Sequence, residues 1–382
     1  MHLQILIILG IIGILGECYL ICLWIFARQK KKKEIPHPYS PSACVIVPCK
    51  GFGKGITENL NAFCSQQYPT YQLIFVVDSK KDPIYQHLEQ ITEKYPHATI
   101  RITKSKRSCS GKIAALLTGL ESIKPVEVLV FADCDIKPNA TWLKNLIAPL
   151  HDVTIGASTG YRWYFPTNLK TQLISAWNMA TIAFMFYPRY TFAWGGSTAI
   201  RKSVFNKLEI KSKWQTAFSD DLVVTTTLKK AGYSIYFQPK CIMESPTETQ
   251  EETSIKQFMR WGTRQYTWVR WYYPIFWYGS FIGFVGIKLF TILGICLLII
   301  GYYFPGLLMV STIFLEIIYG WQGITTFQKT MVYPQQRFSS KIKYALMTPI
   351  AFFMIAQNVL ASSIKREIPW AGRTYKKPKH QD

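Results

Sequence analysis

The sequence predicts an α/β protein with an open, mostly parallel sheet flanked by helices, and with transmembrane or interfacial helices at its N- and C-terminal ends. Short apolar runs alternate with helical patterns between residues 43 and 250. An apolar stretch opens the chain, and others return after Pro274. Charged residues make up only 17% of the sequence and aromatic residues 15%. This balance excludes a disordered chain and disfavours a wholly soluble one.

The first segment is predicted to be an uncleaved membrane anchor. Residues 3–26 carry one formal charge, Glu17, and about 20 apolar residues are enough to cross a bilayer as a helix. The basic run 28–33 follows this stretch, whereas a signal peptide carries its positive charge in front. Because positive residues stay on the cytoplasmic side, we expect the N-terminus outside and the next domain inside.

The formal net charge is +22, from 44 Lys and Arg against 22 Asp and Glu, which raises the question of a nucleic-acid partner. Membrane topology and contact with anionic lipids account for the run 28–33. We therefore expect membrane lipids, and no nucleic acid, as partners. The six histidines lack the spacing of zinc ligands. The nine cysteines are expected to remain thiols in a reducing compartment.

Four apolar runs are predicted to be strands. They cover residues 43–48, 73–77, 99–103 and 128–132. Continuous apolar runs are typical of strands that are covered on both faces, as in parallel sheets. Helical patterns at 112–120 and 141–150 complete the alternation. In such sheets, ligands bind beyond the carboxyl ends of the strands.

Acidic residues follow two of these strands. Asp78 comes after the second, and Asp133 and Asp135 come after the fourth. A turn at that point would let Asp133 and Asp135 converge on one Mg²⁺ or Mn²⁺, because hard divalent cations prefer oxygen ligands and share them with substrate phosphates. The alternative is a structural strand end, with Asp135 in the turn before a helix.

Two glycine-containing segments are candidates for phosphate contacts. Gly111 and Lys112 stand at a predicted helix start, where backbone N–H groups favour anions. The loop 50–55 lacks the Gly-Lys-Ser/Thr ending of a P-loop and the spacing of a dinucleotide-binding fingerprint. Lys112 is therefore the better candidate, and a flexible turn is expected at 50–55.

Ser219, Asp220 and Asp221 precede a helical pattern that continues through Lys230. In one interpretation Ser219 is the N-cap and the two aspartates complement the helix dipole. In the other, one carboxylate is a general base at the active site. The local sequence favours neither.

The segment 251–278 is rich in arginine and aromatic residues, which is typical of an interfacial amphipathic helix. Beyond it, residues 281–302 and 305–324 are long enough to span a membrane, and 344–364 is less apolar. If all three crossed the membrane in addition to the N-terminal anchor, the C-terminus would be outside, whereas the basic tail favours inside. One of the three is therefore expected to be interfacial or re-entrant.

In chain order, the acidic motifs and the arrangement Gln257-x-x-Arg260-Trp261 resemble a processive-type family 2 glycosyltransferase of the GT-A fold. Within that group the chain is most similar to the ceramide glucosyltransferase branch. This similarity rests on residues 77–83, 111–113 and 131–133, on the spacing from Asp221 to Gln257, and on the tail 370–375. It covers nearly the whole chain.

The resemblance implies roles for the donor residues. Asp78 would contact the uridine, and Gly111 and Lys112 would contact the nucleotide sugar. Asp133 would also contact the nucleotide sugar. Together with Asp135, it would hold Mg²⁺ or Mn²⁺ on the diphosphate.

The resemblance also implies roles at the reacting end. Asp221 corresponds to the catalytic base, and Asp220 occupies the position where the family usually has Glu. Gln257, Arg260 and Trp261 would line the acceptor and diphosphate end of the site.

The implied function is inverting transfer of a sugar from a UDP-sugar to the hydroxyl headgroup of a lipid such as ceramide, with glucose as the favoured sugar. Three alternatives remain: a polysaccharide synthase, an enzyme that uses another lipid such as diacylglycerol or a hopanoid, and a non-catalytic basic membrane scaffold. The catalytic domain is expected on the cytoplasmic side of the plasma or inner membrane in a bacterium, or of an ER or Golgi-type membrane in a eukaryote.

Six segments are expected in the chain. They are the anchor 1–27, a basic linker 28–42, the catalytic domain 43–250, the interfacial segment 251–278, membrane segments 279–364 and a basic tail 365–382.

Overall fold

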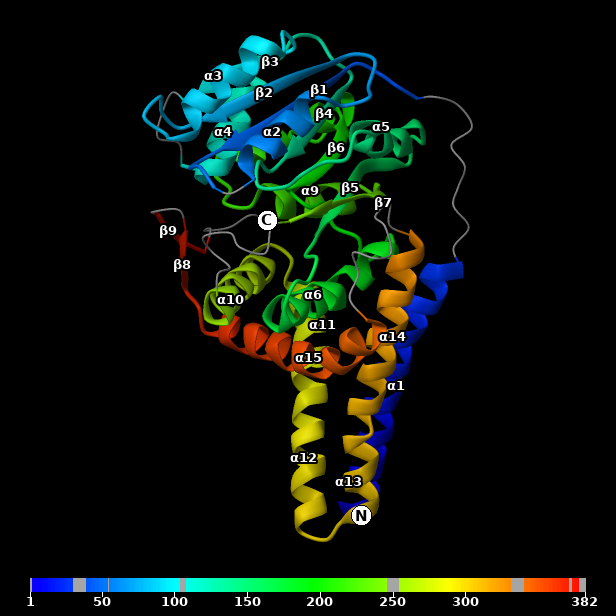
Figure 1. Cartoon of the computed structure of the whole chain (residues 1–382). Helices are drawn as coiled ribbons and strands as arrows, with labels where there is room; N and C mark the ends of the chain where they lie inside the picture. Colours follow the sequence, from blue (N-terminus) through cyan, green and yellow to red (C-terminus); the bar gives the residue numbers. More distant parts are fainter. Residues whose placement is uncertain are drawn as a thin grey trace. The chain divides into compact units, whose positions relative to one another are not determined.

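Two compact units make up the chain in a computed structural model, which describes residues 2–29, 39–53, 55–103, 108–245, 254–330, 340–370 and 373–377 (Figure 1). The sheet unit comprises Lys33–Trp163, Tyr187–Gln250 and Pro369–Asp382. The helical unit comprises Met1–Lys32, Tyr164–Phe186 and Glu251–Ile368. The expected catalytic domain 43–250 thus includes one stretch, Tyr164–Phe186, that groups with the helical unit.

A seven-stranded sheet lies at the centre of the sheet unit, in the order β3-β2-β1-β4-β6-β5-β7. The strands are β1 Ala43–Cys49, β2 Tyr71–Val77, β3 Ala98–Ile102, β4 Val128–Ala132, β5 Ile155–Trp163, β6 Ser197–Arg201 and β7 Ser234–Glu244. β6 runs antiparallel to β4 and β5, and all other pairs are parallel. The predicted fold class, a mostly parallel sheet, is confirmed.

Helices flank this sheet. They are α2 Ile56–Cys64, α3 Ile84–Lys94, α4 Gly111–Leu120, α5 Trp142–Ile147, α7 Lys202–Lys207, α8 Ile210–Trp214 and α9 Asp220–Lys230. The first four strands match the predicted apolar runs to within two residues, because β4 and most of β1 and β2 are buried. The helix predicted at 141–150 is shorter. It continues as a 3₁₀ helix over Ala148–His151, where Pro149 lacks the N–H that an α-helix needs.

The helical unit contains the apolar helices and one amphipathic helix rich in arginine and aromatic residues. They are α1 His2–Gln29, α6 Leu169–Ile182, α10 Ile255–Tyr272, α11 Pro274–Ser280, α12 Ile287–Ile299, α13 Tyr303–Val310, α14 Thr312–Thr330 and α15 Lys341–Ser363. A π-helical turn over Phe281–Gly286 joins α11 to α12. Two short strands follow α15: β8 Glu367–Trp370, which crosses the boundary between the two units, and β9 Arg373–Lys376, which belongs to the sheet unit.

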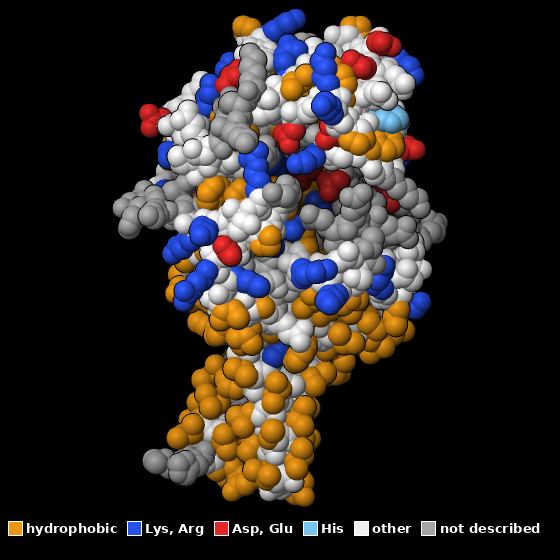
Figure 2. Space-filling model, turned by 90° about the vertical axis from the view of Figure 1, so that its left-hand side faces the viewer, with side chains coloured by type: hydrophobic (Ala, Val, Ile, Leu, Met, Phe, Trp, Pro, Cys, Tyr) orange, Lys and Arg blue, Asp and Glu red, His pale blue; other side chains and the backbone are white. Residues whose placement is uncertain are grey.

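Four helical stretches of the described chain have the length and composition to cross a membrane: Leu3–Arg28, Pro274–Ile299, Tyr303–Thr330 and Lys341–Ser363. The first three run lengthwise beside one another, whereas α15 lies across them (Figure 1). Hydrophobic side chains predominate on the visible surface of the lengthwise helices (Figure 2).

Polar and aromatic contacts hold these helices in register. Trp24 of α1 is fully buried and meets Tyr319 and Phe327 of α14 edge-on, with ring centroids 5.8 and 5.3 Å apart. Between α12 and α14, Nζ of Lys288 lies 2.5 Å from Oε1 of Glu316. An ion pair accounts for the charged residue inside an otherwise apolar segment.

The helix α15 has two different faces. Its exposed stripe contains the apolar residues Ile342, Leu346, Ile350, Phe353 and Leu360, together with Lys343 near its start and Gln357. Its buried face includes Asn358, which accepts a hydrogen bond from Trp177 of α6 and donates one to the carbonyl of Met259 in α10. The polar residues that make this segment less apolar therefore include one that packs against protein.

Candidate active site

Strand ends of the sheet unit carry the predicted acidic residues. Asp78 follows β2 and forms an ion pair with Lys50, which follows β1, with 3.4 Å between Nζ and Oδ2. Asp133 follows β4, and its backbone N–H donates to the carbonyl of Gly196, in the loop that enters β6. The carboxyl end of the parallel strands thus positions these aspartates, as expected for an α/β sheet.

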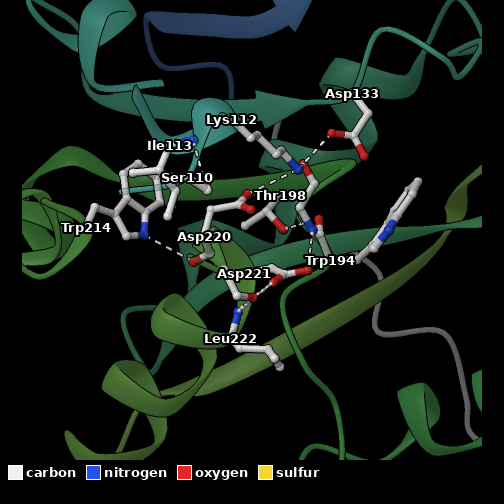
Figure 3. Close-up of polar contacts among 12 residues, drawn as sticks. Ser110, Lys112, Ile113, Asp133, Trp194, Thr198, Trp214, Asp220, Asp221 and Leu222 are labelled. Atoms are coloured by element: carbon white, nitrogen blue, oxygen red, sulfur yellow. Dashed lines mark hydrogen bonds and ion pairs between the residues drawn. The ribbon is translucent and has the colours of Figure 1, made fainter. Parts of the chain in front are cut away.

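Lys112 is the centre of a charged cluster that also contains Asp133, Asp220 and Asp221 (Figure 3). The helix α4 begins at Gly111 with Ser110 as its N-cap, and this start directs Lys112 toward the strand ends. Its Nζ lies 2.7 Å from Oδ1 of Asp133 and 3.2 Å from Oδ2 of Asp220. It also donates to the carbonyl of Gly195.

The electrostatic surroundings keep Lys112 charged. Burial alone would lower the pKa of Lys112, but the carboxylates of Asp133, Asp220 and Asp221 raise it above its usual value. Lys112, which the sequence predicts to contact a phosphate, therefore already neutralises carboxylates of the protein. Whether it also meets a phosphate stays a prediction.

The two aspartates at the start of α9 have different environments. Asp220 is buried, and its carboxylate faces Lys112. Burial raises the pKa of Asp220 to about 6, against the opposing effect of Lys112. Asp221 is only partly buried. Its Oδ1 accepts hydrogen bonds from the hydroxyl of Ser219, at 2.5 Å, and from the N–H of Leu222, at 2.8 Å.

The helix-cap interpretation is therefore correct for Ser219 and Asp221. It does not account for Asp220, whose side chain turns away from the helix to Lys112 (Figure 3). The cap interpretation also leaves room for a second role of Asp221. Its other oxygen, Oδ2, lies 3.4 Å from the backbone nitrogen of Gly195, whose carbonyl accepts from Lys112.

Gly195 and Gly196 allow this close approach. A Cβ on Gly195 would lie 2.6 Å from both Oδ2 of Asp220 and Nζ of Lys112. A Cβ on Gly196 would lie 2.2 Å from the ring of Trp194. A side chain at either position would displace the groups that form the cluster.

Sequence reasoning missed Arg162. It lies near the end of β5, and its Nη2 is 3.9 Å from Oδ2 of Asp133 and 3.7 Å from Oδ2 of Asp135. Its guanidinium lies 5.3 Å from the centre of the Trp194 ring. A single arginine in the otherwise uncharged segment that forms β5 was the available signal, because a charge that becomes buried needs partners.

The residues present fit one divalent cation. Lys112 and Arg162 compensate two of the four negative charges of the nearby carboxylates, so two remain. These carboxylates belong to Asp133, Asp135, Asp220 and Asp221. Burial raises the pKa of Asp135, with Arg162 opposing it. Its Oδ1 is buried and accepts no hydrogen bond from the described residues. Those residues include no cluster of three or more His, Cys, Asp or Glu arranged around a metal. A cation would therefore complete its shell with water or substrate oxygens, as Mg²⁺ often does.

The predicted acceptor residues belong to the helical unit. Gln257 lies in the first turn of α10, where Ser254 is the N-cap. Trp261 stacks on Phe258, with ring centroids 5.4 Å apart, and Arg260 is exposed. Their approach to Asp221 stays a prediction.

Comparison with known proteins gives consistent matches. The model of the family described as Glycosyl transferase family 21 matches residues 5–381. The probable glycosyltransferase YdaM of Bacillus subtilis is 28% identical over 242 residues, which are 60% of this chain and 55% of YdaM. A ceramide glucosyltransferase of Komagataella phaffii is 32% identical over 81 residues, 21% of this chain and 16% of that protein. The chain thus matches only about half, or less, of the length of these relatives.

A solved structure with the same fold is the mannosyltransferase PcManGT from Pyrobaculum calidifontis, in complex with GDP-Man and Mn²⁺. Its TM-score is 0.51 at 17% sequence identity, over 94% of this chain and 98% of that one.

Proposed function

The chain belongs to glycosyl transferase family 21, and from this premise we propose that it moves glucose from a UDP-sugar to the hydroxyl headgroup of a membrane lipid such as ceramide. Its activity as a glycosyltransferase follows from the family; the donor and the acceptor are the proposal. Ceramide glucosyltransferases among its relatives and its apolar helices support a lipid acceptor. The observation that carries the proposal is the carboxylate of Asp221, held beside the Lys112 cluster.

Asp221 is the proposed general base. The hydroxyl of Ser219 and the N–H of Leu222 fix one carboxylate oxygen, so the side chain is oriented before substrate arrives. The carboxylate of Asp221 takes the proton of the acceptor hydroxyl. At the same time, the acceptor oxygen bonds to the anomeric carbon and the bond from that carbon to UDP breaks. One displacement inverts that centre, and a positioned base contributes about 10²–10⁴-fold.

Asp133 and Asp135 would hold one Mg²⁺ or Mn²⁺ in this proposal. Such an ion acts as a Lewis acid that neutralises charge developing on the UDP leaving group. Lys112 neutralises Asp133 and Asp220 and so keeps both carboxylates in place. Asp78 is proposed at the uridine.

Three residues of α10 complete the proposed site. Arg260 would meet the diphosphate, and Gln257 and Trp261 would line the acceptor. All three lie in the first two turns of a helix that carries aromatic residues on its buried face. This composition suits a helix at the membrane interface, where a lipid headgroup enters.

The proposed topology has three spans: α1, the stretch of α11 and α12, and the stretch of α13 and α14. We place α15 in the plane of the interface, because it lies across the spans and exposes an apolar stripe. An odd number of spans, with the N-terminus outside, leaves the sheet unit and the basic tail both in the cytoplasm. This arrangement agrees with the positive charge that follows α1 and α15.

The decisive experiment is a transfer assay on the purified full-length protein in lipid vesicles. UDP-glucose, UDP-galactose and GDP-mannose are each offered with ceramide, diacylglycerol or a hopanoid, and products are identified by mass spectrometry. We expect glucosylceramide. A polymeric product would instead indicate a polysaccharide synthase, and transfer only from GDP-mannose would overturn the proposed donor.

A further inference from the structure

Arg162 brings a positive charge into the site from a strand that is otherwise uncharged. β5 spans Ile155–Trp163 and contains no other charged residue. The side chain of Arg162 is 10% exposed, and its guanidinium lies near both Asp133 and Asp135. A buried arginine is costly unless its charge is paired, and the carboxylates of Asp133 and Asp135 supply opposite charge beside it.

The two cations of the cluster engage the carboxylates differently. Lys112 approaches Asp133 to 2.7 Å, the distance of a charge-assisted hydrogen bond. Arg162 stays 3.9 and 3.7 Å from the carboxylates of Asp133 and Asp135. The guanidinium therefore lies beside both acidic groups, at longer distances than the one at which Lys112 meets Asp133.

Trp194 holds the guanidinium in this position. Its ring lies 5.3 Å from the guanidinium carbon, within the range of a cation–π contact. The backbone of Trp194 is itself fixed, since its N–H donates to Thr159 and its carbonyl accepts from Thr198. The arginine is thus oriented by a rigid aromatic face.

A cation bound to Asp133 and Asp135 would change the balance around Arg162. It would neutralise the two carboxylates that attract the guanidinium and would repel it as a like charge. An anion with two or more charges, bridging the cation and the arginine, satisfies both. The planar fork of arginine fits phosphate oxygens in a bidentate way.

We propose that Arg162 binds the diphosphate of the nucleotide-sugar donor, as a second arginine on the leaving group from within the sheet unit. This inference rests on the proposed function, since it assumes a nucleoside-diphosphate donor. It assigns a substrate contact to β5, a strand that carries none of the predicted motifs.

The test measures binding rather than turnover, on the full-length protein in detergent. UDP is titrated by calorimetry at saturating Mn²⁺, and Mn²⁺ alone is titrated by the loss of its free-ion EPR signal. For Arg162→Gln we expect UDP affinity to fall about 10-fold or more. Affinity for Mn²⁺ alone should stay equal or increase, because a neighbouring positive charge is gone.

Two variants control this result. Arg101→Gln removes an exposed arginine from β3, remote in sheet order from β5, and should leave UDP affinity unchanged. Arg162→Lys keeps the charge without the planar fork and should bind UDP at an intermediate affinity. The lysine variant also decides the question if Arg162→Gln does not fold.

Either of two outcomes would overturn the inference. UDP affinity in the Arg162 variants equal to wild type would remove the diphosphate contact. Loss of affinity for Mn²⁺ alone would make Arg162 only a support for the carboxylates. Wild-type binding of GDP in place of UDP would overturn the proposed donor, while GDP titration would still test Arg162, because both nucleotides carry a diphosphate.

Discussion

Nζ of Lys112 lies 3.2 Å from Oδ2 of Asp220, and the same nitrogen lies 2.7 Å from Oδ1 of Asp133. One lysine therefore joins the start of α9 to the end of β4. The shorter side chain of Asp220, where a glutamate was expected from the resemblance, still reaches Lys112. It does so because Gly195 has no Cβ to separate them. This contact suggests that Asp220 positions the cluster rather than taking the acceptor proton.

Replacing the proposed base tests that division of roles. In Asp221→Asn, turnover should fall at least about 10²-fold while UDP-sugar binding changes little, because only proton transfer is lost. Asp220→Asn is the control at the same helix start and should lower turnover less. The assay pairs donor titration with formation of lipid product. Near-normal transfer by Asp221→Asn would reject the mechanism.

Removing Lys112 should destabilise the sheet unit. Lys112→Met leaves the carboxylates of Asp133 and Asp220 without their shared cation, and breaking a buried ion pair in this way costs about 3–5 kcal/mol. Thermal unfolding is the measurement, with exposed Lys124→Met as the matched control, for which the change should stay within about 0.5 kcal/mol. Equal melting temperatures for the two variants would contradict the contacts described for Lys112.

The raised pKa of Asp220 predicts a pH dependence of stability. Its pKa is about 6 in the folded protein against 3.8 as the ordinary value, so the folded state holds this proton more tightly than the unfolded state. The contribution of Asp220 to stability should therefore fall as the pH rises from about 4 to about 6. The wild-type melting temperature minus that of Asp220→Asn isolates this group, and a difference that increases over this range would contradict the prediction.

Metal removal provides another test. EDTA should abolish transfer, and Mn²⁺ or Mg²⁺ should restore it, because among the described residues Lys112 and Arg162 compensate only part of the negative charge of the carboxylates. Asp135→Asn should raise the Mn²⁺ concentration needed for half-maximal activity, since it removes the carboxylate whose Oδ1 accepts no hydrogen bond from the described residues. Full turnover without metal would refute the assignment.

Cysteine labelling with an impermeant reagent tests the topology. In intact cells, Tyr303→Cys at the turn between α12 and α13 should react, whereas Lys124→Cys in the sheet unit and Lys377→Cys after β9 should react only after lysis. Parallel labelling of the parent protein controls for its own nine free cysteines. Reaction of Lys377→Cys in intact cells would show that α15 crosses the membrane.

The sequence by itself determined the strands β1 to β4, the apolar helices and the aspartates at the strand ends. These features depend on local runs of hydrophobicity and on residues that directly follow them, which are readable along one dimension. The same reasoning identified none of β5, β6 or β7, whose mixed composition carries a weaker pattern.

Only the tertiary structure decided which charges meet. Arg162 reaches Asp133 and Asp135 because β6 lies between β4 and β5 in the sheet, and strand order is set by packing rather than by neighbouring residues. The direction of α15 likewise depends on contacts such as that of Asn358 with Trp177 in α6. Hydropathy registers how apolar a helix is, but its orientation follows from the surfaces against which it packs.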